Sequence, residues 1–361
     1  MKTLQIALST LILLSLPLVS FAETTTEILT KVSQNKGQSF TANRMQKLVR
    51  TNLKLEANAS IDYVDSKNFS ISVKNPGGIA GIKFATNYGK STIFFPYERL
   101  AFVDALASSG DMITDTIMGK ISTDIPLLLK NYNVVLKVDD QIASIPTYVI
   151  QLVPKPEIAS KSYWATPGRT FWINKNNYQI LREDRSWAEN SEPFFTSQYT
   201  QYKTLSYSES PNVKLRIPYN VKKVPLAMAK NSETDTFMTG YKSVQEAEKA
   251  LKQKIETPKY LPAGFKFREI QALNFYDTRI IIQKYDDGVN SMFLTYRTKP
   301  NLFLTLLAGK FSLDLLHKMS DLSYHAPYNY MTKETNENLV ISFGDLYPDD
   351  LKKVNDSVAV K

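Results

Sequence analysis

A strict alternation of apolar and polar side chains runs through residues 53–63. Successive side chains of a β-strand point to opposite faces, so this pattern predicts a strand with one buried and one solvated face. Residues 69–73 repeat the alternation, and Pro76, Gly77 and Gly78 provide a turn before further predicted strands at 82–84 and 92–95. Connections this short predict that the strands form an antiparallel sheet.

Helical patterns precede and interrupt these strands. Thr24 and Glu27 have the spacing of a capping box, which predicts a first helix over residues 24–35. Three apolar segments, at 100–106, 112–118 and 123–130, predict short helices, and Pro126 falls in the first turn of the third, where proline is tolerated. We expect these three helices to cover the apolar face of the sheet as a lid. Strands are then predicted at 134–136, 148–153, 171–173, 178–185, 194–207 and 213–217.

The C-terminal third has a different pattern, which predicts a second domain. Ser243 and Glu246 form another capping box at the start of a predicted helix over 244–255. Strands are predicted at 267–273, 278–285, 291–298 and 339–343, and Pro348 opens a last helix. Weak periodicity between the two parts indicates a linker. The predicted organisation is a first domain at 23–220, a linker at 221–240 and an α+β domain at 241–361.

The N-terminus has the pattern of a secretory signal. Lys2 supplies a positive start, residues 4–19 are mainly apolar, and Ser20, Phe21 and Ala22 form a cleavage site with small residues. A membrane anchor is the alternative, but the apolar run is shorter than the roughly 20 residues of a membrane span. We therefore expect residues 1–22 to be a signal peptide cleaved near Ala22, and the protein to be periplasmic.

Composition narrows the possible partners. The chain has no cysteine, which excludes disulfides and lipid attachment to cysteine. Its formal net charge is +9, which favours acidic partners such as lipid head groups, lipopolysaccharide or acidic proteins. The basic residues are scattered, so we expect no nucleic-acid partner and at most a peripheral contact with a membrane.

The usual patterns of catalytic and metal sites are missing from the sequence. His317 and His325 are its only histidines, and their spacing does not suit a metal site. No G-x-S-x-G motif or glycine-rich phosphate loop occurs, and Ser33 with Lys36 matches S-x-x-K without the other motifs of that enzyme class. Acidic pairs at 139–140, 286–287 and 349–350 fall at expected turns or helix starts, where aspartate caps backbone amides. We expect no cofactor, no metal and no enzymatic activity.

The remaining candidate site is the apolar face of the sheet. Ala57 and Ala59 are small residues on that face, and they either allow helices to pack closely or form the floor of a cavity. The chain also carries 20 Tyr, 18 Phe and 3 Trp, which fill cores but also line concave apolar sites. From the alternation we predict a ligand site lined by Leu53, Leu55, Ala57, Ile61, Phe69, Ile71, Phe95, Met112, Ile117, Met118, Leu128, Ile150 and Phe171.

Several motifs, in a shared order, resemble one known family. Residues 127–134 (LLLKNYNV) and 147–155 (TYVIQLVPK) resemble the passage from lid to strand in the sigma-E regulators of the RseB/MucB family. Residues 171–175 (FWINK) followed by 180–183 (ILRE) are similar to a recurrent hairpin of that family, with Asn174 where the family often has Asp. Residues 260–265 (YLPAGF) and 340–346 (VISFGDL) resemble the entry and the ending of its second domain.

The resemblance implies an α+β protein with a LolA-like antiparallel half-barrel, an inserted helical lid and a smaller α+β C-terminal domain. Proteins of this family bind acyl chains or lipopolysaccharide, or clamp an anti-sigma factor. The implied function is an exported envelope protein that binds a lipid or lipoprotein and regulates a sigma-factor pathway through a membrane-bound anti-sigma factor. The alternative is a periplasmic lipoprotein or lipid carrier without a regulatory role, which needs only the first domain.

Overall fold

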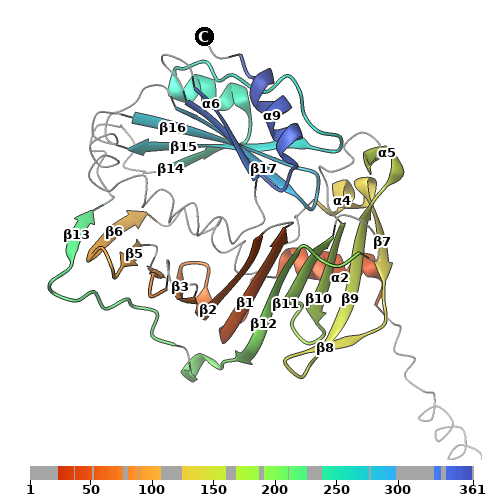
Figure 1. Cartoon of the computed structure of the whole chain (residues 1–361), viewed down its shortest axis with the longest axis vertical. Coiled ribbons are helices and arrows are strands. Elements are labelled where there is room, and N and C mark those ends of the chain that lie inside the picture. The colour runs from red at the N-terminus through yellow and green to blue at the C-terminus, as the bar shows by residue number, and fades with distance from the viewer. Residues whose placement is uncertain are drawn as a thin grey trace, which may run out of the picture.

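The computed structural model describes residues 23–35, 37–50, 53–75, 80–88, 90–106, 124–159, 168–186, 191–209, 211–225, 238–275, 278–297, 329–334 and 339–359. Two β-sheets dominate this part of the chain, one of 13 strands and one of six (Figure 1). The predicted signal peptide at 1–22, the predicted helix at 112–118 and both histidines lie outside the described residues.

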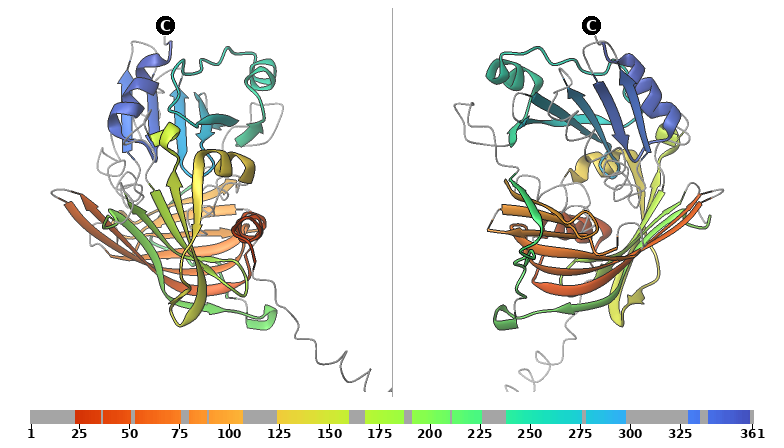
Figure 2. Two further views of the ribbon diagram at one scale, coloured as in Figure 1. Left: turned by 90° about the vertical axis from the view of Figure 1, so that its right-hand side faces the viewer. Right: turned by 60° about the vertical axis from the view of Figure 1, so that its left-hand side comes forward.

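The larger sheet has β1 at its centre. On one side of β1 the order is β2, β3, β4, β5, β6 and β13, and on the other β12, β11, β10, β9 and β7, while β8 pairs with β9 alone. Every pairing is antiparallel except that of β13 with β6. Figure 2 shows that this sheet bends and stays open. Its strands are β1 (Phe40–Arg50), β2 (Leu53–Asp65), β3 (Asn68–Asn75), β4 (Lys83–Asn87), β5 (Lys90–Phe95), β6 (Leu100–Leu106), β7 (Tyr132–Leu136), β8 (Asp140–Ile142), β9 (Ile145–Pro154), β10 (Gly168–Asn174), β11 (Ile180–Ser186), β12 (Phe195–Thr204) and β13 (Lys222–Pro225).

Two helices, α2 (Thr25–Gln34) and α4 (Ile125–Asn131), cover the half of the sheet that ends at β7. The predicted capping box of α2 is present, with the Glu27 amide donating to Thr24 Oγ1 at 3.2 Å and the Thr24 amide to Glu27 Oε2 at 2.8 Å. Ile28 and Leu29 are fully buried on the sheet side of α2, together with Leu128 of α4. A further short helix, α5 (Pro156–Ala159), follows β9.

The smaller sheet forms the second unit. Its order is β14 (Met238–Tyr241), β15 (Lys266–Phe275), β16 (Thr278–Asp286), β17 (Ser291–Arg297), β19 (Leu339–Gly344) and β18 (Asn329–Glu334). Helix α9 (Pro348–Ser357) buries Leu351 and Val354 against this sheet, while α6 (Val244–Leu251) packs near β14 and β15. The predicted extension of α6 to residue 255 is wrong, because Lys252 ends the helix in a left-handed conformation with φ 50°.

Three differences from the predicted elements have physical causes. The segment 100–106, predicted as a helix, is strand β6, with Leu100 and Phe102 on one face and Ala101 on the other. A strand that is covered on both faces has a continuous apolar run, which periodicity alone does not distinguish from a buried helix. Residues 213–217, predicted as a strand, pair with no other strand, although Val213 is buried. Strand β1 has mixed alternation, and no strand was predicted for it.

Residues 221–240, which the sequence assigns to a linker, contain β13 and β14. Strand β13 is an edge strand of the larger sheet, and β14 is an edge strand of the smaller one. The intervening residues 226–237 lie outside the described part of the chain. Each sheet is thus extended by a short strand taken from this interval.

Candidate functional site

One row of paired residues crosses six strands of the larger sheet. The register joins Ile150 to Phe171, Phe171 to Glu183, Glu183 to Ser197, Ser197 to Gln46, and Gln46 to Ala57. Side chains of directly paired residues point to the same face of a sheet. We call the face that carries this row the inner face, and the opposite one the outer face.

The register places the predicted site residues of the described strands on the inner face. Leu55 pairs with Leu48 two residues before Ala57, and Ile61 pairs with Ile71, while Phe69 pairs with Tyr63. Phe95 packs in a cluster with Val73, which pairs with Ala59. Leu128 lies on α4, which covers the same face. Met112, Ile117, Met118 and the side chain of Leu53 lie outside the described residues.

Seven of these residues belong to three separate clusters rather than to one continuous lining. Leu128, Ile150 and Phe171 pack with α2, Ile61 and Phe69 pack around the ring of Phe40, and Phe95 packs with Ile82 and Leu100. Ile61, Phe69, Phe95, Leu128, Ile150 and Phe171 are each at most 1% exposed. A side chain this buried contacts a ligand only after the elements that cover it move. Their role in ligand binding stays a prediction.

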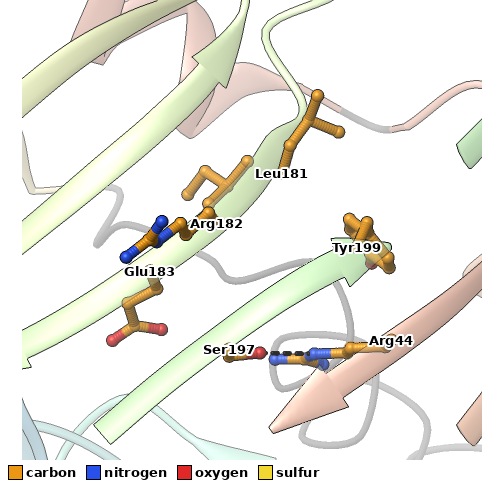
Figure 3. A pocket seen from close by; sticks show the side chains of 7 residues that line it. Arg44, Leu181, Arg182, Glu183, Ser197 and Tyr199 are labelled. Atoms are coloured by element: carbon orange, nitrogen blue, oxygen red, sulfur yellow. Dashed lines mark hydrogen bonds between the residues drawn. The ribbon is translucent and has the colours of Figure 1, made fainter. Parts of the chain in front are cut away.

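The inner face is not uniformly apolar. Arg44 of β1 donates from Nε to Ser197 Oγ on β12 at 2.6 Å (Figure 3). Arg44 and Ser197 line a small recess of about 10 Å³, which has room for about one water molecule. Leu181, Glu183 and Tyr199 also line it. A polar belt of Glu183, Ser197, Gln46 and Arg44 therefore separates the apolar residues of β9 and β10 from those of β2 and β3. The sequence pattern of β2 alone did not reveal this belt.

A second candidate region is the joint between the two sheets. The turn between β16 and β17, residues 287–290, enters the first unit, where Val289 joins the core of α2, α4, β9 and β10. Tyr132 Oη donates to Asp287 Oδ2 at 2.6 Å, and Asn290 Nδ2 donates to Tyr132 Oη at 2.6 Å. Asn131 Nδ2 donates to the carbonyl oxygen of Asp287 at 2.7 Å. We call this turn and its contacts the interdomain joint.

A buried charge cluster completes the joint. Arg169 of β10 donates to Glu183 Oε1 at 2.9 Å, to Asn290 Oδ1 at 2.7 Å and to Asp345 Oδ2 at 2.7 Å. Arg185 of β11 donates to Glu183 Oε1 at 2.6 Å and also binds Asp345 Oδ1. These four charged residues are 5–6% exposed, so two arginines and two carboxylates are held together away from solvent. Charges buried in this way are stable only when paired, because desolvation is costly.

A third contact extends the joint toward the solvent. Arg268 of β15 donates from Nη1 to Asp124 Oδ2 at 2.7 Å and from Nε to Asp286 Oδ2 at 2.6 Å. Asp124 is also the N-cap of α4 and accepts the Leu127 amide at 2.9 Å. The hydrogen bonds from Arg268 and Leu127 hold the pKa of Asp124 below its ordinary value. The start of α4 is thus fixed by a residue of the second unit.

Two of the buried carboxyl groups of the joint, Asp287 and Glu183, have pKa values that shift in opposite directions. Burial raises the pKa of Asp287 above its ordinary 3.8, and the hydrogen bonds from Tyr132, Asn290 and Val289 only partly oppose this effect. Burial also acts to raise the pKa of Glu183, but Arg185 and Arg169 outweigh it and hold that pKa below its ordinary 4.5. Of these two groups, Glu183 is therefore the one whose charged form the joint favours.

We expect Glu183→Gln to change how stability depends on pH. A carboxyl with a lowered folded-state pKa contributes stability above its unfolded pKa and loses it as the pH falls through its folded pKa. At neutral pH the variant should lose about 3 kcal/mol of unfolding free energy, because Arg169 and Arg185 lose a charged partner. The difference from the parent protein should shrink as the pH falls below the ordinary glutamate pKa of 4.5, because the folded-state pKa of Glu183 is lowered. Urea unfolding at several pH values measures it.

The matched control for this variant is Glu209→Gln. Glu209 also has a lowered pKa, caused by hydrogen bonds from Ser206 and Lys203, but it is exposed and remote from the joint. Its replacement should leave the neutral-pH stability nearly unchanged. A Glu183→Gln difference that stays constant across the same pH range would contradict the assignment of Glu183 as the charge that the joint favours.

Sequence reasoning missed the charge cluster, although signals for it exist. Residues 182–185 read Arg-Glu-Asp-Arg inside the strand predicted at 178–185, and charged residues of a strand are seldom buried unless paired. The sequence predicts that Asp287 caps a turn, and its carboxylate accepts the Val289 amide at 2.9 Å. It also bonds to Tyr132 of the first unit, which no local pattern indicates.

The described residues contain no group of three or more His, Cys, Asp or Glu side chains that could hold a metal ion. Among the helices of this part of the chain, none has the length and apolar character required to cross a membrane.

Comparison with known proteins identifies solved structures that share the fold of this chain. No protein-family model matches the chain, and no curated protein matches it. Among solved structures, the crystal structure of MucB is similar, with a TM-score of 0.52 and 12% identity over 93% of this chain and 98% of that chain. MucB in complex with MucA(peri) and the Pseudomonas aeruginosa MucA/MucB complex both match with TM-score 0.50, 12% identity and the same coverage. The chain has the α+β fold of MucB along nearly its whole length, with an open, mainly antiparallel sheet followed by a smaller one.

Proposed function

We propose that this chain is an exported, non-enzymatic envelope protein that regulates a sigma-factor pathway by binding a membrane-bound anti-sigma factor, and that it responds to a lipid or lipoprotein ligand. The likeness to MucB, which includes MucB in complex with MucA(peri), is the observation that carries the proposal. The likeness covers 93% of this chain, so it includes both sheets and not only the first. A lipid carrier needs the first sheet alone, which favours the regulator.

The interdomain joint supports a role in which both units act on one partner. Arg169 and Arg185 from the first unit and Asp345 from the second are buried together, so the two sheets are held in a fixed relation. A segment of a partner that contacts both units would therefore meet a preformed surface, which reduces the entropy lost on binding. In this proposal residues 23–220 and 241–361 are the two domains, residues 1–22 are removed on export, and the protein acts in the periplasm.

The ligand site that we propose is the inner face of the larger sheet. Burying an acyl chain there yields about 0.8 kcal/mol per methylene group, so a recess of modest size gives useful affinity. Ala57 and Ala59 provide small side chains beside Leu48 and Leu55, and Arg44 provides a cation for the polar end of the ligand. Because Phe69, Ile150 and Phe171 are buried in the described structure, the ligand must displace covering elements to reach them.

We expect Ala57→Trp to block ligand uptake while the fold is retained. Ala57 is 9% exposed and lies at the middle of β2, so an indole ring would occupy the space above Gln46 and Ala59. The measurement is the amount of lipid that is extracted from the purified protein and identified by mass spectrometry. The control is Glu56→Trp, which places the same ring on the outer face of the same strand, where Glu56 is exposed. Equal lipid content in Ala57→Trp and the parent protein would refute the proposed ligand site.

Affinity capture from a detergent-solubilised envelope extract tests the regulatory function. The expected result is recovery of a single-span membrane protein whose extracytoplasmic part binds the purified chain. Protection of that part from proteolysis in the complex would support the clamp. Recovery of lipid or lipoprotein without any single-span protein would instead favour the carrier, and recovery of neither would overturn both.

A further inference from the structure

The segment 211–225, which follows the last central strand, has an unusual distribution of charge. It contains Lys214, Arg216, Lys222 and Lys223 and no acidic residue. Between Val213 and Ile217 the apolar and basic residues alternate, and Val213 is buried while Lys214 and Arg216 are exposed. We call residues 211–225 the basic segment.

The basic segment lies on the outer face of the larger sheet. Leu215 and Ile217 pack against Phe94 of β5 and Ala101 of β6. Phe95, the neighbour of Phe94, belongs to the inner-face cluster, so Phe94 points outward. At its end the segment becomes β13, the edge strand that pairs with β6. The apolar side chains are thereby used in packing, and the basic ones are left to face solvent.

A groove lies between the basic segment and strands β3 and β4. Its volume is about 360 Å³, and its lining combines the hydroxyl-bearing Ser70 and Ser72 with three basic residues, Lys83, Lys214 and Arg216. None of the described residues that line it is acidic. Asp62 pairs with Ser70 in the register of β2 and β3, and its carboxylate accepts a hydrogen bond from Thr41 at 2.9 Å. Hydroxyl donors with several cations suit a phosphate group.

Two exposed tyrosines flank the same surface. Tyr97 in the turn before β6 is 68% exposed, and Tyr219 in the basic segment is 100% exposed. The two turns are tied together, because the Lys222 amide donates to the carbonyl oxygen of Arg99 at 2.8 Å. Tyrosine has an apolar ring and a polar tip, and it is enriched where proteins meet the head groups of a membrane. Basic residues near such rings are attracted to anionic lipids.

Protection of the sheet edge does not explain the whole pattern. Lysine on an edge strand prevents pairing with another chain, which accounts for Lys222 and Lys223 of β13. Lys214 and Arg216 precede that strand and pair with no strand, and the exposed tyrosines do not oppose pairing at all. A partner with dense negative charge and an interfacial region accounts for all of these residues together.

We propose that the outer face formed by the basic segment and the turn before β6 docks on an anionic phospholipid surface, with a head-group phosphate in the groove beside Ser70 and Ser72. This surface is distinct from the inner face, so the proposal does not rest on the acyl-ligand site. Docking there would hold the protein at a membrane while the inner face and the joint remain accessible.

Vesicle co-sedimentation with the purified protein tests the proposal. We expect binding to vesicles that mix phosphatidylglycerol with phosphatidylcholine, little binding to phosphatidylcholine alone, and weaker binding as salt increases. Lys214→Glu with Arg216→Glu should weaken binding at least about tenfold. The control, Lys249→Glu with Lys259→Glu, makes the same change of net charge at exposed positions of the second unit and should bind as the parent does. Tyr97→Ser with Tyr219→Ser should weaken binding without changing net charge.

Several outcomes would overturn the proposal. One is absence of binding to vesicles that contain phosphatidylglycerol, and another is an equal loss of vesicle binding in the two charge-reversal variants. The third is full displacement of the protein from vesicles by inorganic phosphate at a concentration equal to that of the lipid phosphate. The last result would indicate a site for free phosphate. The lipid content of the purified charge-reversal variants separates this proposal from the proposed function. If Lys214→Glu with Arg216→Glu retains its acyl ligand but loses vesicle binding, the outer surface and the inner-face site are independent.

Discussion

Replacement of Gly288 by valine should separate the two units of the protein. Gly288 has φ +98°, and a Cβ atom at this position would lie 2.6 Å from the Leu128 nitrogen and 2.7 Å from its Cα. These are backbone atoms of α4, so the turn 287–290 or the helix must move. A positive φ costs about 1–3 kcal/mol for a residue with a side chain, and overpacking costs about 1–3 kcal/mol more. We expect a lower unfolding midpoint, an increased radius of gyration in small-angle X-ray scattering and faster proteolysis between the units.

Gly240→Val is the matched control for this variant. Gly240 is also a glycine of the second unit, in β14, but no atom lies within 4 Å of an added Cβ there. Its replacement should leave the scattering profile and the unfolding midpoint nearly unchanged. The second sheet keeps its own core in either variant, which includes Leu294, Val340 and Leu351, so circular dichroism should retain the β-sheet signal. An unchanged radius of gyration for Gly288→Val would mean that the turn is not held at α4.

The fold class could be predicted from local patterns because each pattern has a direct physical cause. The alternation of 53–63 predicted β2, and the capping box at Thr24 predicted α2, and both are present. The open antiparallel sheet and the second α+β unit are also confirmed. The sequence predicts a helix where strand β6 lies because β6 has apolar residues on both faces: Leu100 and Phe102 pack with Phe95 on the inner face, and Ala101 packs with the basic segment on the outer face.

The joint was predictable only in part. Four of the motifs that resemble the sigma-E regulators contribute to it: residues 127–134 contain Asn131 and Tyr132, residues 180–183 contain Glu183, residues 260–265 contain Gly264, and residues 340–346 contain Asp345. Each motif encodes a strand, helix or turn when it is considered alone. Their convergence depends on contacts between residues more than a hundred positions apart, such as Tyr132 with Asp287, and no local periodicity carries that information.

Asp345→Ala should produce the largest loss of stability at the charge cluster. Its carboxylate binds Arg185, accepts from Arg169 at 2.7 Å and accepts the Ser291 amide at 3.0 Å. Without it, the two buried guanidinium groups lose one of the two carboxylates that pair with both of them, which leaves an excess of buried positive charge. Breaking a buried pair in this way costs about 3–5 kcal/mol. Urea unfolding at neutral pH measures the loss, and Asp356→Ala, which breaks an exposed pair with Lys352, is the control that should change little.

A double-mutant cycle with Arg185→Met distinguishes pairing from a general loss of packing. If Asp345 stabilises the fold through its charge partners, removal of Arg185 also removes the charge that Asp345→Ala leaves unpaired. The double variant should therefore lose less unfolding free energy than the sum of the two single losses, with a coupling of about 1–3 kcal/mol. Additive losses would mean that Asp345 acts through the Ser291 amide and local packing. A coupling of the expected sign would mean that Arg185 and Asp345 stabilise the fold as a pair. The fixed arrangement of the two sheets would then depend on charges that neither sheet could bury without the other.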